Sequence, residues 1–261
     1  MTDRPILFSA PMVRSNHDGR KTNTRRFLKP QPSNQNAKMC GFVGMGDTKA
    51  VFSADYPNQP ETIRLPISVG DRLWVRETWK PGAWRDDGRI AIDYRAHPEL
   101  TNTPWCNLPE SVDWRELQRL WNAELLRAGS VPDANNFHHW KPGQSPMRWR
   151  SGIHMPRWTS RQTLIVTDLK IERLQNITEK EAIAEGVEPL HGGWFPYGIS
   201  TFMTTIQDGW EVPAQHCTSA RDSFRMLWEH INGKGSWDAN PWIIAYTYRV
   251  INRNIDQIEV A

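Results

Sequence analysis

A run of nine residues near the start of the chain, 19–27, holds the densest group of side chains that could do chemistry. It reads Gly-Arg-Lys-Thr-Asn-Thr-Arg-Arg-Phe and so carries four cations and two hydroxyls. Four like charges this close repel one another unless a polyanion, a substrate or internal carboxylates neutralise them. We therefore predict that the chemistry of the protein lies here, and that the rest of the chain holds this segment and faces it.

A carboxylate that could face this run lies on the clearest predicted strand, 73–79. The strand follows a Val-Gly-Asp turn and is rich in β-branched and aromatic residues. Strict alternation places Leu73, Val75, Glu77 and Trp79 on one of its faces. A glutamate on an apolar face needs a charged or hydrogen-bonding partner, because burial without one is costly. We expect Glu77 to have such a partner.

A second basic stretch, 147–161, interleaves arginine with tryptophan. Arginine and aromatic side chains are the surfaces on which unpaired bases stack. The alternative is that Trp149 and Trp158 are core residues, with the arginines lying along them and their charged ends in water. Residues 1–38 also have an excess of Lys and Arg. The two stretches could form one basic face that suits a nucleic acid or an anionic ligand.

The composition favours a globular fold rich in loops and β-structure. Of the 261 residues, 38% are hydrophobic and 14 are tryptophan, while Gly and Pro number 17 and 19. The formal net charge is only +3, so the chain is no polycation. Three cysteines without metal-type spacing argue against a disulfide framework, and no apolar run reaches the length of a membrane span. We expect a cytosolic protein without a membrane segment, metal or cofactor, and interpret His138 and His139 as polar loop residues.

The predicted elements follow the order strand, helix, basic turn, hairpin, helix, strand, two helices and strand. Strands are expected over 5–9, 63–79, 89–95, 163–174 and 241–251, and residues 30–60 as a long loop or ragged hairpin. Helices are expected near 11–18, over 111–127, after the Thr178–Glu181 capping box, and over 220–232. Closure would remove exposed sheet edges, which suggests a small closed or nearly closed barrel. We predict one α+β domain over 1–261, with a core of about 6–95 and 152–251 and insertions at about 97–144 and 190–219.

The basic run contains the pattern Gly19-x-Lys21-x-x-Thr24-x-Arg26, and the turn at 69–71 leads into Trp-Val-Arg-Glu at 74–77. Both features resemble the ASCH domain, a member of the PUA-like barrel superfamily. The whole chain resembles ASCH-type proteins carried by phages and prophages of enteric bacteria, although the two insertions lie outside the resemblance. The likeness implies a small mixed β-barrel with peripheral helices, located in the cytoplasm of a bacterial host. It also implies a cleft that binds RNA, a nucleotide or a modified base.

One branch of that family hydrolyses the amide of N4-acetylcytidine, and its catalytic residues correspond to Lys21, Thr24 and Glu77. With its pKa lowered by neighbouring cations and by burial, Lys21 would take the proton from Thr24. Thr24 would attack an acyl carbon, and Glu77 would protonate the departing amine or activate the water that resolves the acyl-enzyme. Arg26 would neutralise developing negative charge or hold a phosphate. The other residues expected to bind substrate or nucleic acid are Arg20, Arg25, Trp74, Trp79, Arg150, Arg157, Trp158 and Arg161.

Three functions stay open at this point. The first is amide hydrolysis on N4-acylated cytidine. The second is a binding module without chemistry for RNA, single-stranded nucleic acid or a modified nucleoside, with affinity that falls steeply with salt. The third is a ribonuclease, for which His154 is the histidine to test. A buried Lys21–Glu77 ion pair would explain the same residues as scaffold. A protein partner is compatible with a phage origin, but no residue selects one.

Overall fold

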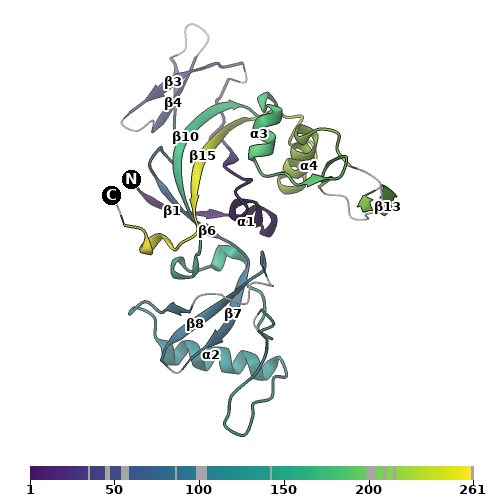
Figure 1. The fold of residues 1–261 in the computed structure, drawn as a ribbon. Coiled ribbons are helices and arrows are strands. Elements are labelled where there is room, and N and C mark those ends of the chain that lie inside the picture. Colours follow the sequence, from purple (N-terminus) through teal and green to yellow (C-terminus); the bar gives the residue numbers. More distant parts are fainter. Residues whose placement is uncertain are drawn as a thin grey trace. The chain divides into compact units, whose positions relative to one another are not determined.

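The computed structural model describes all residues except 35, 45–47, 54–58, 86, 98–104, 142, 198–203, 208–209, 214–215 and 260–261, and for 204–207 and 210–213 it describes the backbone alone. Parts of both expected insertions therefore lie outside the described residues. The described chain is a mixed α+β structure with more sheet than helix (Figure 1). This confirms the predicted α+β class.

A five-stranded sheet positions the basic run. Its order is β1 (Asp3–Leu7), β6 (Arg72–Arg76), β10 (Thr163–Arg173), β15 (Trp242–Ile251) and β2 (Asn23–Phe27). β15 and β2 pair antiparallel, with Tyr246 opposite Thr24 and Ile244 opposite Arg26. Within the described strands the order ends at β1 and β2, so a closed barrel is not formed there.

Four smaller sheets complete the β-structure. The segment 30–60, expected as a long loop or ragged hairpin, contains two strands of a three-stranded antiparallel sheet. This sheet consists of β3 (Met39–Val43), β4 (Lys49–Phe52) and β5 (Glu61–Arg64). A second sheet contains β7 (Trp79–Trp84), β8 (Arg89–Tyr94) and β9 (Cys106–Asn107). The predicted strand 73–79 is thus split after Arg76, and β8 pairs with the new strand β7. The two remaining pairs are β11 (Pro189–Leu190) with β12 (Gly193–Trp194), and β13 (Thr204–Gln207) with β14 (Trp210–Pro213).

The α-helices of the described chain lie close to their predicted positions, although α2 begins at Trp114 rather than near residue 111. α1 covers Ala10–His17 and α2 covers Trp114–Arg127, where the Asp113 side chain accepts hydrogen bonds from the first-turn amides. α3, Glu179–Ala184, has the predicted Thr178–Glu181 capping box. α4, Ala220–Asn232, begins at a Ser219 cap. Short 3-10 turns occupy Gly152–His154, Arg157–Thr159, Leu174–Asn176 and Ile255–Gln257.

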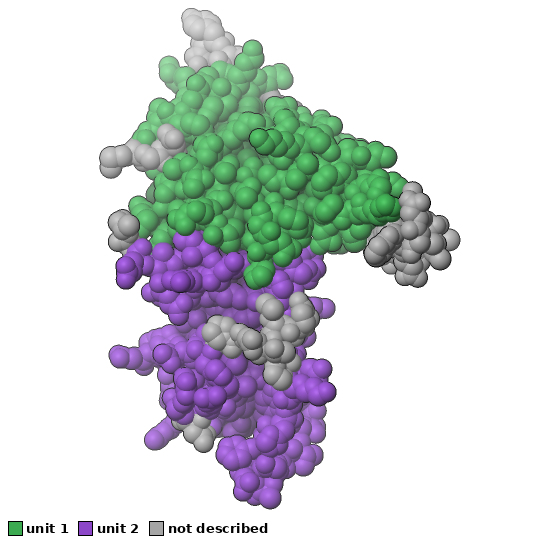
Figure 2. Space-filling model, viewed as in Figure 1, with its two compact units in different colours: residues 1–2, 15–72, 165–250 green, residues 3–14, 73–164, 251–261 purple. Residues whose placement is uncertain are grey.

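The described chain divides into two compact units, each with its own core (Figure 2). Unit 1 comprises residues 1–2, 15–72 and 165–250, and unit 2 comprises 3–14, 73–164 and 251–261. In unit 1, α4 packs Phe224 and Trp228 against Ile243 of β15. In unit 2, Trp121 and Leu125 of α2 pack in one cluster with residues of β7 and β8, such as Trp79 and Ile92. Among the described residues, no helix is both long and apolar enough to cross a membrane.

Candidate functional site

The predicted basic turn joins α1 to β2 within unit 1. Gly19 ends the helix with a φ of +72°, a conformation in which a side chain is strained. The backbone amides of Arg20 and Lys21 both donate to Ser15 O, at 2.9 and 3.0 Å. The Thr22 amide then donates to Ala184 O at the end of α3, at 2.9 Å. The turn is therefore held by backbone bonds on both sides before the chain enters β2.

The Lys21 side chain is fully buried, and its ammonium group is surrounded by acceptors. Nζ donates to Asn23 O and Glu185 O, both at 2.8 Å, and to Glu185 Oε2 at 2.9 Å. An ammonium has three N–H donors, so these three acceptors match its full capacity. Burial lowers the pKa of Lys21, and the neighbouring Glu185 carboxylate opposes that shift.

The carboxylate that meets Lys21 is thus Glu185, which the sequence gives no reason to select. It is the C-cap residue of α3 and precedes Gly186. An acidic residue between a helix and a glycine is too common a pattern to indicate a site. Gly186 has a φ of +84°, and a Cβ added there would lie 2.8 Å from both Lys21 Cβ and Ser15 Cβ. Only glycine lets the end of α3 approach the basic turn this closely.

Arg25, which lies in β2, belongs to the same cluster of charged side chains. Its guanidinium is fully buried and contacts Glu172 at 3.0 Å, Glu185 at 3.2 Å and Glu181 at 3.3 Å. Lys170 also contacts Glu172, at 2.7 Å. Arg25 was expected to be available for a phosphate, but these internal carboxylates neutralise it instead.

Thr24 and Arg26, the other signature side chains, also turn inward. Thr24 is 2% exposed and Arg26 is half-buried, whereas Thr22 is exposed. Burial lowers the pKa of Arg26. Nearby, the buried Tyr248 hydroxyl donates to Asn16 Oδ1 at 3.0 Å, and burial raises its pKa well above the ordinary value of 10.0. The interior around the signature is therefore rich in polar groups with internal partners.

Glu77 belongs to unit 2, where it has the partner expected of a buried glutamate. Its carboxylate accepts from Arg161 Nε at 2.8 Å and from Arg161 Nη2 at 3.0 Å, a two-pronged ion pair. Arg161 also lies over the Tyr94 ring at 4.0 Å and contacts His97 Nδ1 at 3.1 Å. Burial raises the pKa of Glu77, and the bonds from Arg161 oppose that shift.

The remaining predicted arginines are also paired with carboxylates. Arg20 contacts Asp18 at 3.0 Å, and Arg150 contacts Glu124 at 2.7 Å. Arg157 bonds Asp3 at 2.6 Å and Asp256 at 2.9 Å, and these partners raise its pKa. The ion pairs at Arg25, Arg150, Arg157 and Arg161 neutralise part of the positive charge from which the basic face was predicted.

The predicted stacking tryptophans lie mostly in the core. Trp79 is 5% exposed and belongs to the apolar cluster of unit 2, while Trp158 is half-buried and packs against that cluster. Trp74 is 9% exposed, with the Arg76 guanidinium 5.2 Å from its ring centre. In the described structure, Trp74 and Trp79 therefore offer little free ring surface to a base.

Neither a metal centre nor a relative guides the interpretation further. Among the described residues, no group of three or more His, Cys, Asp or Glu side chains could hold a metal ion. His139 pairs with Asp133 at 2.8 Å, and His154 is exposed. In comparisons with protein-family models, curated proteins and solved structures, the chain matches none significantly.

Proposed function

We propose that this protein binds a modified nucleoside as a PUA-like protein of the ASCH type, with the site at the signature turn. The observation that carries the proposal is the inward placement of Lys21, Thr24 and Arg26, the side chains that the signature names. Burying polar groups costs free energy unless each finds a partner. These three side chains therefore lie in a polar interior, where burial lowers the pKa of Lys21 and of Arg26. Ionisable groups with shifted pKa values cluster at functional sites.

A small ligand fits this cluster better than a long polyanion does. Nucleic-acid binding draws on free Lys and Arg side chains that replace counterions along the phosphates. Here Arg25, Arg150 and Arg157 are already paired with carboxylates of the protein, so their charges are less available to phosphates. We therefore expect an affinity that changes little between about 50 and 200 mM salt, in contrast to the steep dependence of a polymer-binding surface.

Hydrolysis of an N4-acyl group is the second candidate function. The observation that favours it is the lowered pKa of the buried Lys21, because a lysine that loses its proton more easily can serve as a base. In this scheme Lys21 takes the proton of Thr24 Oγ, and the oxygen forms an ester with the acyl carbon as the C–N bond breaks. Lys21 returns this proton to the departing amine, and water then cleaves the ester, which releases the carboxylic acid and restores the Thr24 hydroxyl. Glu185, in direct contact with Lys21 within unit 1, is the candidate for the acid–base role that the sequence assigned to Glu77.

The binding proposal is tested by calorimetric titration of the full chain with N4-acetylcytidine and with cytidine at low and high salt. We expect saturable binding of the acetylated nucleoside, with cytidine weaker. The matched pair of variants is Thr24→Val, which removes a buried hydroxyl while keeping the side-chain shape, and Thr22→Val, which does the same at an exposed position. The proposed site would be overturned if the protein bound neither nucleoside. It would also be overturned if Thr24→Val and Thr22→Val bound N4-acetylcytidine with equal affinity.

The same mixtures separate binding from catalysis. Chromatography of the incubated N4-acetylcytidine detects any cytidine released over time. If Thr24→Val still binds but releases none, while Thr22→Val turns over normally, Thr24 is the nucleophile. Glu185→Gln then tests whether this carboxylate assists. A wild-type protein that binds without releasing cytidine refutes the hydrolase and leaves the binding function.

A further inference from the structure

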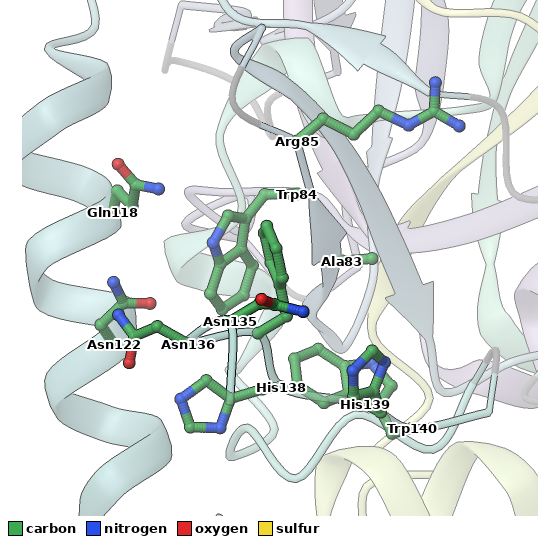
Figure 3. Close-up of a pocket in the computed structure, with 11 residues that line it drawn as sticks. Ala83, Trp84, Arg85, Gln118, Asn122, Asn135, Asn136, His138, His139 and Trp140 are labelled. Atoms are coloured by element: carbon green, nitrogen blue, oxygen red, sulfur yellow. The ribbon is translucent and has the colours of Figure 1, made fainter. Parts of the chain in front are cut away.

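A second candidate site lies within unit 2 and uses none of the signature residues. It is a pocket of about 510 Å³ between the end of β7, one side of α2 and the loop 135–140 (Figure 3). Its aromatic walls are Trp84, Phe137 and Trp140. Gln118 and Asn122 project from α2 toward Trp84, and Asn136 extends toward Asn122 from the loop (Figure 3). Pockets of this size hold small organic ligands.

The loop that carries Phe137 is held in one conformation by Asp133. The Asp133 carboxylate accepts from the backbone amides of Asn135 and Phe137, at 2.8 and 2.9 Å, and contacts His139 Nε2 at 2.8 Å. The Asp133 amide in turn donates to Phe137 O at 2.8 Å. The loop thus fixes the backbone of Phe137 while 54% of this residue stays exposed. An exposed aromatic ring on a fixed backbone is preorganised for stacking, because little conformational freedom is lost on binding.

The other two aromatic rings are also fixed in place. Trp140 Nε1 donates to Gly82 O, and the Trp84 and Trp140 ring centres lie 6.0 Å apart. Trp84 also packs on Trp121 of α2, with 5.2 Å between ring centres. The side of the pocket formed by β7 is therefore anchored to the core of unit 2, whereas Phe137 is 54% exposed.

The polar lining indicates the class of ligand. Amide side chains present donors and acceptors together, as the edges of nucleobases do, and they pair with such edges in two-pronged contacts. Among the described residues that line the pocket there is no carboxylate. Arg85 is a cation, and the imidazoles of His138 and His139 are engaged with Ser130 and Asp133, each at 2.8 Å. The Arg85 guanidinium lies 4.3 Å from the Trp105 ring and extends away from the amides in Figure 3. This lining disfavours a cation and gives a phosphate group little to hold.

We propose that this pocket binds an unpaired nucleobase, stacked on Phe137 and read at its edge by the amides of Gln118, Asn122 and Asn136. The inference goes beyond the proposed function, because the pocket lies in unit 2 and the signature turn in unit 1. Since phosphate contributes little, a nucleoside and its 5′-monophosphate bind alike. A base at the end of a single strand offers the same chemistry as a free nucleoside.

The test is a titration of the full chain with adenosine, cytidine, their 5′-monophosphates and a single-stranded RNA hexamer, followed by calorimetry. Phe137→Ala is compared with Leu126→Ala, which removes an exposed apolar side chain from α2 outside the pocket. Loss of a stacking aromatic weakens binding by about tenfold or more, so Phe137→Ala should show this loss and Leu126→Ala should not. Asn122→Ala should alter the preference between adenosine and cytidine. Thermal melting checks that all three variants keep the wild-type fold.

Each outcome of these titrations bears on the pocket separately from the signature turn. Equal binding by Phe137→Ala and Leu126→Ala would overturn the inference, as would a wild-type protein that binds none of the probes at millimolar concentration. Binding that is lost in Thr24→Val but retained in Phe137→Ala would place the ligand at the signature turn, which refutes the pocket and supports the proposed function. If the RNA hexamer binds more tightly than the nucleoside, the base comes from a single strand. If the two affinities are equal, the ligand is the free nucleoside.

Discussion

Replacing Lys21 by methionine tests whether the buried ammonium organises the signature turn. The change removes three hydrogen bonds, two to backbone carbonyls and one to Glu185, whose side chain is only 4% exposed. Methionine keeps most of the apolar stem, so the loss is chiefly that of the charge and its bonds. Breaking a buried ion pair by removing one partner costs about 3–5 kcal/mol, because the other charge stays buried without it.

Arg25 moderates this loss, because it contacts Glu185 at 3.2 Å and remains in the variant. We therefore expect a value near the lower limit, about 3 kcal/mol, and a fall of about 1 M in the urea midpoint for a slope of about 3 kcal/mol per M. Glu185→Gln in the Lys21→Met background removes the carboxylate charge that Lys21 no longer neutralises. The two changes should then be non-additive, with the double variant more stable than the sum of the single losses by at least about 1 kcal/mol.

The assay is urea unfolding of the full chain, followed by tryptophan fluorescence. The matched control is Arg119→Met on α2, which breaks an exposed ion pair with Glu116 and should leave the midpoint unchanged. If Lys21→Met unfolds at the same urea concentration as this control, Lys21 does not stabilise the turn. Strict additivity of Lys21→Met and Glu185→Gln would likewise refute the ion pair as the source of the effect.

Three further predictions concern single substitutions within the two units. Gly186→Ala should destabilise the protein by about 1–3 kcal/mol more than Gly70→Ala, because both glycines have positive φ but only Gly186 is crowded; urea midpoints compare them. Arg161→Leu should cost more stability at pH 7.5 than at pH 5. Burial raises the folded pKa of Glu77 above its ordinary 4.5, and Arg161 opposes this rise. Without Arg161 the folded pKa rises further. The stability contributed by protonated Glu77 is present below pH 4.5 and is lost as the pH rises through the folded pKa. Equal losses at both pH values would contradict this. Thr178→Ala should cost about 1 kcal/mol through loss of the α3 cap, measured by the same unfolding.

Much of the secondary structure could be predicted from local patterns. The helix 220–232 and the strands β10 and β15 agree with their predictions within one or two residues, because each is a long periodic segment bounded by caps, glycine or proline. The capping box of α3 was also predicted, since it depends on residues three apart. The hairpin was only partly predicted. Its turn lies as expected before Arg89, but the strand that pairs with β8 is β7. β7 contains a proline and a glycine, which argue against a strand in the sequence.

The sequence by itself determined which polar side chains form the signature, and it required a partner for a glutamate on an apolar strand face. Only the tertiary structure decided the partners. Lys21 meets Glu185, 164 positions away, and Glu77 meets Arg161, 84 positions away. Hydrophobic periodicity says which residues leave water, but a carboxylate can reach a cation only after strand order and helix ends place the two backbones side by side. For the same reason the arginines, which in the linear chain resemble a basic face, are largely neutralised in the fold.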